Sequence, residues 1–215
     1  MYKALLFILV LIGSWSQAQD PLRFQEEVAA IQKKYDTLWN SSRETVVFTG
    51  SSSIRFWKNL QDVFPQYQIV NSGFGGSHAS DLLVYAEDLV LKYRPAKVFI
   101  YEGDNDIAFK KKPGEILSDT EQIIHKIRGQ DPNTKIIIIA AKPSLARWHL
   151  KRSYKRLNRR FKRLCSKDRL LEFADVWDAM LNGRHLREDI FIDDGLHMNP
   201  KGYELWYDVI KPYMN

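Results

Sequence analysis

Short apolar runs recur along the chain at intervals that leave room for helices between them. Five of these runs are four to six residues long, and they are mostly continuous rather than alternating with polar residues. Continuous runs rich in Val, Ile or Phe are typical of strands that are buried on both faces of a parallel sheet. The pattern predicts strands at residues 45–49, 68–71, 97–101, 135–140 and 170–173.

The segments between these runs carry apolar residues at helical spacing, and strands that alternate with helices imply a doubly wound sheet. We therefore expect the α/β class, as a three-layer α/β/α sandwich with a five-stranded parallel sheet. Five strands fit the flavodoxin-like order 2-1-3-4-5, although the sequence does not fix the order. The predicted helices are 54–60, 79–93, 113–129, 148–167 and 200–213, preceded by one at 21–40 with Phe24, Val28, Ile31, Tyr35 and Leu38 on one side.

The N-terminus has the pattern of a signal peptide. A short basic start precedes an apolar stretch at 4–13, and the small residues Ser16 and Ala18 occupy cleavage-site positions. We expect a signal peptide at 1–18, a single domain at 19–215 and a secreted or periplasmic location, with an uncleaved anchor as the alternative. The only cysteine, Cys165, excludes an internal disulfide and is interpreted as a small packed hydrophobe.

The net charge of +6 is concentrated in one segment. Between Arg147 and Arg169 the only acid is Asp168. Apolar residues at helical spacing predict that this segment is an amphipathic helix with one apolar stripe. Its basic face is either simply solvated or attracted to an anionic surface such as acidic glycan or lipid headgroups. Nucleic acid is not expected as a partner, because the chain shows no recognition motif.

Chemically useful residues follow the ends of the predicted strands, where sites lie in open α/β sheets. Ser52 follows the first strand, the glycine-rich segment 73–76 the second, and Asn105 the third; Asp194 and His197 come after the fifth. A hydroxyl, an imidazole and an acid are the groups that acyl transfer needs. Backbone N–H groups near the glycines and the Asn105 amide could donate hydrogen bonds to a developing oxyanion.

These four segments resemble the motif blocks of the SGNH hydrolases, also called the GDSL esterase/lipase family. The segment 50–53, Gly-Ser-Ser-Ser, stands where that family has Gly-Asp-Ser-Leu. Gly76 matches the second block, Gly103-x-Asn105-Asp106 the third, and Asp194-x-x-His197 the last. The order and the strand context agree over most of the chain, and the variant resembles the branch with platelet-activating-factor acetylhydrolase-like proteins and bacterial carbohydrate esterases.

The resemblance implies a role for each residue. Ser52 would be the nucleophile, His197 the base and Asp194 the group that orients it, with Ser52, Gly76 and Asn105 forming the oxyanion hole. The sequence departs from the family at Ser51 and Ser53, and Ser51 is the alternative nucleophile. No cofactor is expected.

Two weaker sets of candidates remain. Arg55, Trp57, His78, Arg147 and Trp148 follow strand ends and could line a substrate site, although salt bridges, core packing or helix entry account for them equally well. An oxygen-rich metal site is the less favoured alternative, because acids at strand exits commonly cap helices. It would draw on Glu102, Asp104, Asp106, Asp193, Asp194 and His197.

We therefore expect a serine esterase that hydrolyses short acyl esters, most simply acetyl esters on carbohydrate. The alternatives are a lysophospholipase or thioesterase that acts on longer acyl chains, and a non-catalytic glycan- or envelope-binding protein on the same fold.

Overall fold

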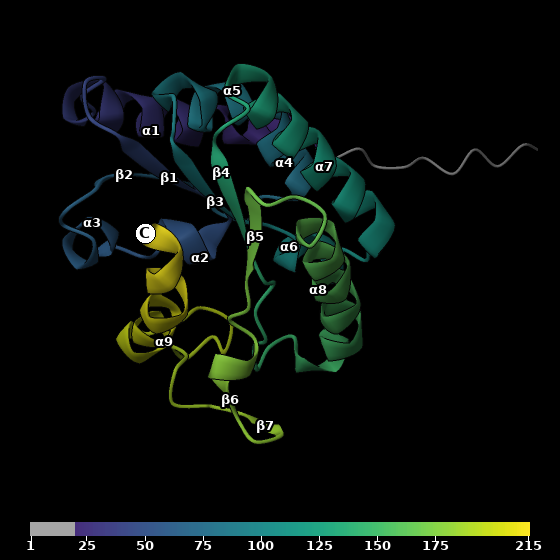
Figure 1. Cartoon of the computed structure of the whole chain (residues 1–215). Coiled ribbons are helices and arrows are strands. Elements are labelled where there is room, and N and C mark those ends of the chain that lie inside the picture. The colour runs from purple at the N-terminus through teal and green to yellow at the C-terminus, as the bar shows by residue number, and fades with distance from the viewer. Residues whose placement is uncertain (1–19) are drawn as a thin grey trace, which may run out of the picture.

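The computed structural model describes residues 20–215, so the predicted signal peptide at 1–18 lies outside the described residues. Its centre is a five-stranded parallel sheet with the strand order β2-β1-β3-β4-β5 (Figure 1). This order confirms the predicted flavodoxin-like arrangement. The strands are β1 (Thr45–Gly50), β2 (Gln68–Gly73), β3 (Lys97–Tyr101), β4 (Lys135–Ile139) and β5 (Leu171–Ala174).

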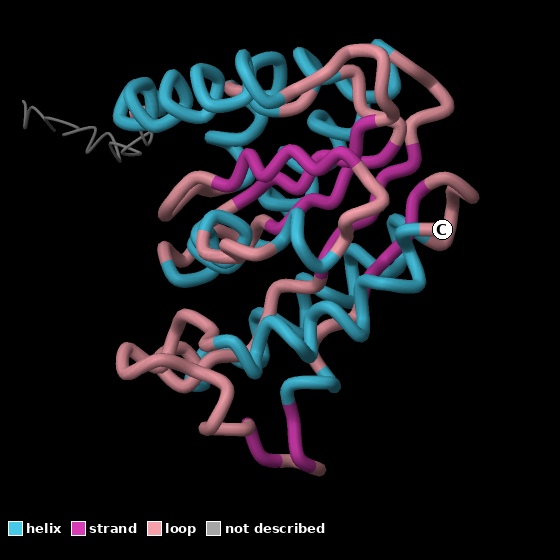
Figure 2. Tube along the Cα trace, turned by 90° about the vertical axis from the view of Figure 1, so that its left-hand side faces the viewer, coloured by secondary structure: helices cyan, strands magenta, loops and turns pink. Residues whose placement is uncertain are grey.

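Helices cover both faces of the sheet, which makes the three predicted layers (Figures 1 and 2). One face carries α1 (Gln25–Leu38), α4 (Ala79–Val84), α5 (Ala86–Leu89), α7 (Pro113–Gln130) and α8 (Lys151–Cys165). The other face carries α2 (Ser52–Arg55), α3 (Leu60–Val63) and α9 (Pro200–Ile210). None of the helices in residues 20–215 has the length and apolar character needed to span a bilayer.

Each strand contributes to two hydrophobic cores because its successive side chains point to opposite faces. Val47 belongs to the core under α1 and α7, whereas its neighbour Val46 belongs to the core under α9. Phe48 of β1 stacks on Phe99 of β3 with ring centroids 4.3 Å apart. The continuous apolar character of the strands follows from this burial on both sides.

Several predicted helices are shorter or broken in the structure. The predicted helix 54–60 is two separate turns, α2 and α3, because Trp57 turns into the core between them with 1% of its surface exposed. The predicted helix 79–93 is divided into α4, α5 and a 3-10 turn, Leu91–Tyr93. Leu38 was expected on the buried side of the first helix, but it lies at its end and is 63% exposed.

Other 3-10 turns lie at helix ends or after a strand, and one small hairpin was not predicted. The turns are Pro21–Phe24 before α1, Trp148–Leu150 before α8, Asp178–Met180 after β5 and Lys211–Met214 after α9. The hairpin pairs β6 (Leu181–Asn182) with β7 (His185–Leu186) beyond β5. A short helix, α6 (Asp104–Ala108), begins three residues after β3 and carries Asn105.

Candidate active site

The turn after β1 holds Ser52 at the start of α2. Gly50 ends the strand with a φ of +125°, and a Cβ there would lie 2.0 Å from the Tyr101 carbonyl oxygen. Only glycine fits so close to the neighbouring strand. The backbone N–H of Ser51 then donates to that same carbonyl, at 3.1 Å. These contacts fix the point at which the chain leaves the sheet and turns into α2.

The loop that carries Asp194 and His197 is closed by its own hydrogen bonds. The backbone N–H of Ile192 donates to the His197 carbonyl at 2.9 Å. The Asn199 side chain caps α9 and donates to the Asp189 carbonyl at 2.8 Å. From outside the loop, the Ala146 N–H donates to the Gly195 carbonyl at 3.0 Å. These hydrogen bonds fix the shape of the loop.

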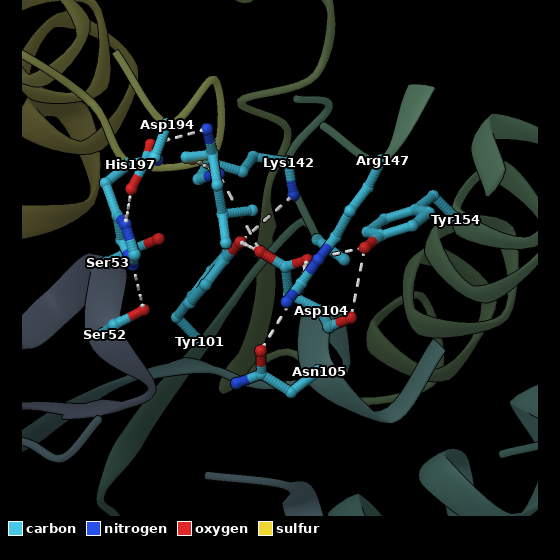
Figure 3. Close-up of polar contacts among 12 residues, drawn as sticks. Ser52, Ser53, Tyr101, Asp104, Asn105, Lys142, Arg147, Tyr154, Asp194 and His197 are labelled. Atoms are coloured by element: carbon cyan, nitrogen blue, oxygen red, sulfur yellow. Dashed lines mark hydrogen bonds and ion pairs between the residues drawn. The ribbon is translucent and has the colours of Figure 1, made fainter. Parts of the chain in front are cut away.

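Ser52, His197 and Asp194 form a continuous chain of side-chain contacts (Figure 3). The Ser52 Oγ lies 2.9 Å from the His197 Nε2, and the His197 Nδ1 lies 2.5 Å from the Asp194 Oδ2. The His197 side chain is 20% exposed, so the imidazole sits at the surface of the molecule and remains accessible. In this arrangement the imidazole can take a proton from the hydroxyl while the carboxylate holds the opposite ring nitrogen.

Hydrogen bonds keep the Asp194 carboxylate ionised. Partial burial raises its pKa, but the His197 ring and the backbone N–H groups of His197 and Leu196 outweigh this effect and lower the pKa to about 2. Both N–H groups donate to the Asp194 Oδ1 at 2.8 Å. The oxygen facing His197 is thus held in place and negatively charged at neutral pH.

The candidate oxyanion donors lie at the ends of β2 and β3. Gly76 has a φ of +77°, and a Cβ there would meet no heavy atom within 4 Å, so its Cα borders open space. The Asn105 Nδ2 donates to the Ser77 carbonyl at 2.9 Å, which ties α6 to the glycine-rich segment. Asn105 is 9% exposed. An amide nitrogen carries two hydrogens, so one remains beyond the bond to Ser77.

Ser51, the alternative nucleophile, is placed differently from Ser52. Its side chain is 2% exposed, and its backbone carbonyl accepts from the N–H groups of Ile54 and Arg55 at the start of α2. The His197 Nε2 contact is made with the Ser52 hydroxyl.

Two of the predicted substrate-wall residues are almost fully buried. Trp57 packs in the core against Phe48, Tyr203 and Trp206. His78 is 1% exposed and caps the N-terminus of α4, and burial followed by nearby cations lowers its pKa to about 3. For His78, helix entry is the role that the structure supports.

The other three predicted wall residues are at least partly accessible. Arg55 is exposed and pairs with Glu27 at 3.1 Å, and Glu27 also accepts from the Gly75 N–H. Trp148 is half-buried and stacks on Trp177, with ring centroids 6.2 Å apart. Arg147 donates through its Nη1 to the Asp104 Oδ1 at 2.6 Å and to the Asn105 Oδ1 at 3.1 Å.

Several acidic residues of the metal alternative have other partners. Within residues 20–215, no three His, Cys, Asp or Glu side chains form a group that could hold a metal ion. Asp106 is buried beside Lys111 and accepts from the Ala79 N–H, and burial raises its pKa to about 6. Glu102 accepts from the Ser77 hydroxyl at 2.6 Å, and burial raises its pKa well above the ordinary value.

Sequence reasoning missed four residues that support the site. The Tyr101 and Tyr154 hydroxyls and the Lys142 ammonium surround Asp104, as Figure 3 shows. Phe56 packs edge-on against the His197 ring at 4.9 Å. The signal for Lys142 was present: a lysine directly after a buried strand falls on the same rim as the other site residues. Tyr101, Tyr154 and Phe56 carry no comparable signal, because aromatic residues at such positions usually pack in the core.

The fold and the serine–histidine–aspartate arrangement define a hydrolase of the flavodoxin-like α/β class. Residues 39–205 match the GDSL-like Lipase/Acylhydrolase family. The chain belongs to this family and is a carboxylic ester hydrolase. No curated protein sequence matches the chain.

Solved structures share the fold at low sequence identity. A protein from Streptococcus pneumonia named for platelet activating factor has a TM-score of 0.77 and 24% identity, covering 90% of this chain and 95% of its own. A GDSL-like lipase from Bacteroides thetaiotaomicron has a TM-score of 0.71 and 20% identity, covering 91% and 97%. A catalytic mutant of an acetylxylan esterase from Geobacillus stearothermophilus has a TM-score of 0.68 and 16% identity, covering 80% and 94%.

Proposed function

We propose that the protein is a serine esterase in which Ser52 is the nucleophile, His197 the general base and Asp194 the residue that orients His197. The observation that carries the proposal is the chain of contacts from the Ser52 Oγ through the His197 ring to the Asp194 carboxylate. The ionised Asp194 stabilises the imidazolium that forms when His197 accepts a proton.

The reaction proceeds in two balanced halves. The Ser52 Oγ bonds to the ester carbonyl carbon while its proton passes to the His197 Nε2. The bond to the alcohol oxygen then breaks, and His197 returns the proton to the departing alcohol. Water attacks the acyl-serine in the same way, gives its proton to His197 and releases the carboxylic acid as Ser52 regains its hydrogen. In both halves the N–H groups of Ser52 and Gly76 and the Asn105 Nδ2 would donate to the carbonyl oxygen.

We infer that the substrate is a short acyl ester, such as an acetyl ester, on a carbohydrate. A cavity of about 440 Å³ next to the catalytic loop is lined by Leu145, Trp148, Lys151 and the hairpin residues Arg184 and His185. Leu145 also approaches Gly195 in that loop. An aromatic face with cationic donors suits a sugar ring. One structural neighbour is named an acetylxylan esterase, and this supports the substrate class.

A longer acyl chain is the second candidate, because an apolar cavity lies against Phe56, the residue that packs on the His197 ring. Its volume is about 450 Å³, and its walls also include Ile192, Met198 and Tyr203. A series of p-nitrophenyl esters from acetate to octanoate separates the two candidates. We expect kcat/KM to be highest for acetate and to fall with chain length. A maximum at octanoate that Ile192→Asp abolishes would favour the lysophospholipase or thioesterase alternative.

The same proposal is tested on sugar esters by following acetate release from acetylated xylo-oligosaccharides. Release by the wild-type chain, and its loss in Ser52→Ala, would support the carbohydrate assignment. A protein that binds these oligosaccharides but releases no acetate would instead fit the non-catalytic glycan-binding alternative.

We further propose that the chain is exported by the leader at 1–18 and meets an acidic polysaccharide through α8. The apolar stripe of α8, which includes Tyr154, Leu157 and Phe161, is buried against the core, so the basic face points outward. The exposed cations of this face form no salt bridge with any of the described residues, and an array of one sign attracts a polyanion. They are Lys151, Arg152, Lys155, Arg156, Arg159, Arg160, Lys162 and Arg163.

A further inference from the structure

The orientation of the Asn105 amide is set by two partners. The Nδ2 donates to the Ser77 carbonyl at 2.9 Å, and the Oδ1 accepts from the Arg147 Nη1 at 3.1 Å. A guanidinium group has only donors, so it can face the amide oxygen but not the amide nitrogen. Arg147 therefore selects one of the two ways in which the amide could lie, the one with its NH₂ group toward the glycine-rich segment.

Arg147 is itself anchored on a buried carboxylate. Its Nη1 lies 2.6 Å from the Asp104 Oδ1, and the same oxygen accepts from the Tyr154 hydroxyl at 2.5 Å. The second oxygen, Oδ2, accepts from the Tyr101 hydroxyl at 2.9 Å. Burial raises the pKa of Asp104, but Lys142 and Arg147 outweigh it and hold the pKa below its ordinary value. The charge that holds Arg147 is thus maintained.

From this geometry we infer that Arg147 is a positioning residue, which holds the Asn105 NH₂ group toward the developing oxyanion. The inference rests on the proposed esterase function. Loss of the guanidinium removes one of these two partners, so the amide can turn over more easily and present its oxygen, which would repel the negative charge of the tetrahedral intermediate. In this account Arg147 acts through Asn105, because its Nη1 is engaged with Asp104 and Asn105.

A double-mutant cycle tests whether Arg147 acts through Asn105. The variants are Arg147→Met, Asn105→Ala and the two combined, assayed on the neutral ester p-nitrophenyl acetate. Arg147→Met is expected to lower kcat on the order of a hundredfold, as loss of one oxyanion donor does, while KM changes little. In the Asn105→Ala background the same substitution should have almost no further effect. A full additional loss in that background, or a change in KM alone, would overturn the inference.

Two further variants separate positioning from a general effect of charge or folding. Arg43→Gln removes one exposed arginine charge elsewhere on the surface and should leave kcat unchanged. Arg147→Lys keeps a cation beside Asp104, and it replaces Arg147→Met in the cycle if the latter fails to fold. We expect Arg147→Lys to lose less of kcat than Arg147→Met. Equal losses in Arg147→Met and Arg43→Gln would contradict a role for the guanidinium in positioning.

The amide can also be observed without any turnover. The side-chain ¹⁵N–¹H₂ signals of Asn105 are assigned by their absence in the Asn105→Ala spectrum. In the wild type they should exchange slowly with solvent, because the group is buried and bonded to Ser77, and in Arg147→Met they should exchange faster or split. Unchanged exchange would overturn the inference even if the enzyme is active. A wild-type chain that hydrolyses no ester would contradict the proposed function. It would not contradict the inference about Arg147, because the amide signal still reports the orientation of Asn105.

Discussion

The buried ammonium of Lys142 donates a hydrogen bond of 2.6 Å to the carbonyl oxygen of Leu196, the residue directly before His197. The same Nζ lies 3.8 Å from the Asp104 Oδ2 and 5.7 Å from the centre of the Phe191 ring. One cation thus links the loop of His197, the proposed base, to the acid next to the Asn105 amide.

Replacement of Lys142 by Met should weaken both folding and catalysis. Asp104 keeps Arg147 and two tyrosine hydroxyls, whereas the Leu196 carbonyl loses its buried donor. We expect the free energy of unfolding to fall by about 2–4 kcal/mol, in the range for breaking a buried charged interaction. The value of kcat should fall as well, because the His197 loop loses an anchor. Urea unfolding and ester hydrolysis measure the two effects.

The exposed substitution Lys167→Met is the matched control and should change neither quantity. A Lys142→Met protein that remains folded and hydrolyses esters at the wild-type rate would show that the contact with Leu196 does not position His197.

Asp106 predicts a pH-dependent contribution to stability. Burial raises its pKa to about 6 in the folded protein, so the folded state keeps the proton after the unfolded chain has released it. Stability from this group is therefore fully present below the unfolded pKa of about 3.9 and is lost as the pH rises through about 6. A shift of about two units corresponds to about 3 kcal/mol at most.

The test compares the wild type with Asp106→Asn at pH 4 and at pH 7 by urea unfolding. The unfolding free energy of Asp106→Asn minus that of the wild type should be larger at pH 7 than at pH 4, because asparagine does not ionise. A difference that is constant, or that moves toward the wild type as the pH rises, would contradict the raised pKa.

The basic face of α8 should bind acidic polysaccharide. We expect the wild type to be retarded in native gels that contain polygalacturonate, with little retardation by neutral xylan and with loss of the effect at high salt, because exposed charges are screened. Replacing three of the arginines with glutamine should abolish retardation and leave the hydrolysis of p-nitrophenyl acetate unchanged. The variant carries Arg156→Gln, Arg159→Gln and Arg163→Gln.

A control of equal charge places the same changes elsewhere on the surface and should bind like the wild type. It carries Lys33→Gln, Lys126→Gln and Lys211→Gln, all at exposed positions. Equal loss of binding in both triple variants would indicate a general charge effect, and binding to anionic lipid vesicles without binding to polysaccharide would reject the glycan proposal.

The layered fold was readable from the sequence because buried parallel strands leave continuous apolar runs. Ile136 to Ile139 are all buried, each facing one of two cores, and an uninterrupted run of isoleucines favours a central strand. The convergence of Ser52, Asn105 and His197 followed from the rule that strand ends share one rim. Helix boundaries were less readable, since the inward turn of Trp57 depends on its fit between Phe48 and Trp206 and not on local spacing.

The partners of individual side chains could not be read in this way. Arg147 and Asp104 are 43 residues apart, and nothing local distinguishes Arg147 from the other arginines of the basic segment. Its contacts with Asp104 and Asn105 depend on how α6 packs against the loop after β4. Trp57 and His78 illustrate the converse: their residue types suited a binding site, but their side chains are buried.

The most direct test of the account is the hydrolysis of p-nitrophenyl acetate by the chain without residues 1–18, compared with its Ser52→Ala and Ser51→Ala variants. The account predicts that the wild type turns over, that Ser52→Ala loses on the order of 10⁴-fold or more in kcat, and that Ser51→Ala keeps most of the activity. Wild-type rates in a folded Ser52→Ala protein, or a complete loss in Ser51→Ala alone, would contradict the assignment of Ser52 as the nucleophile.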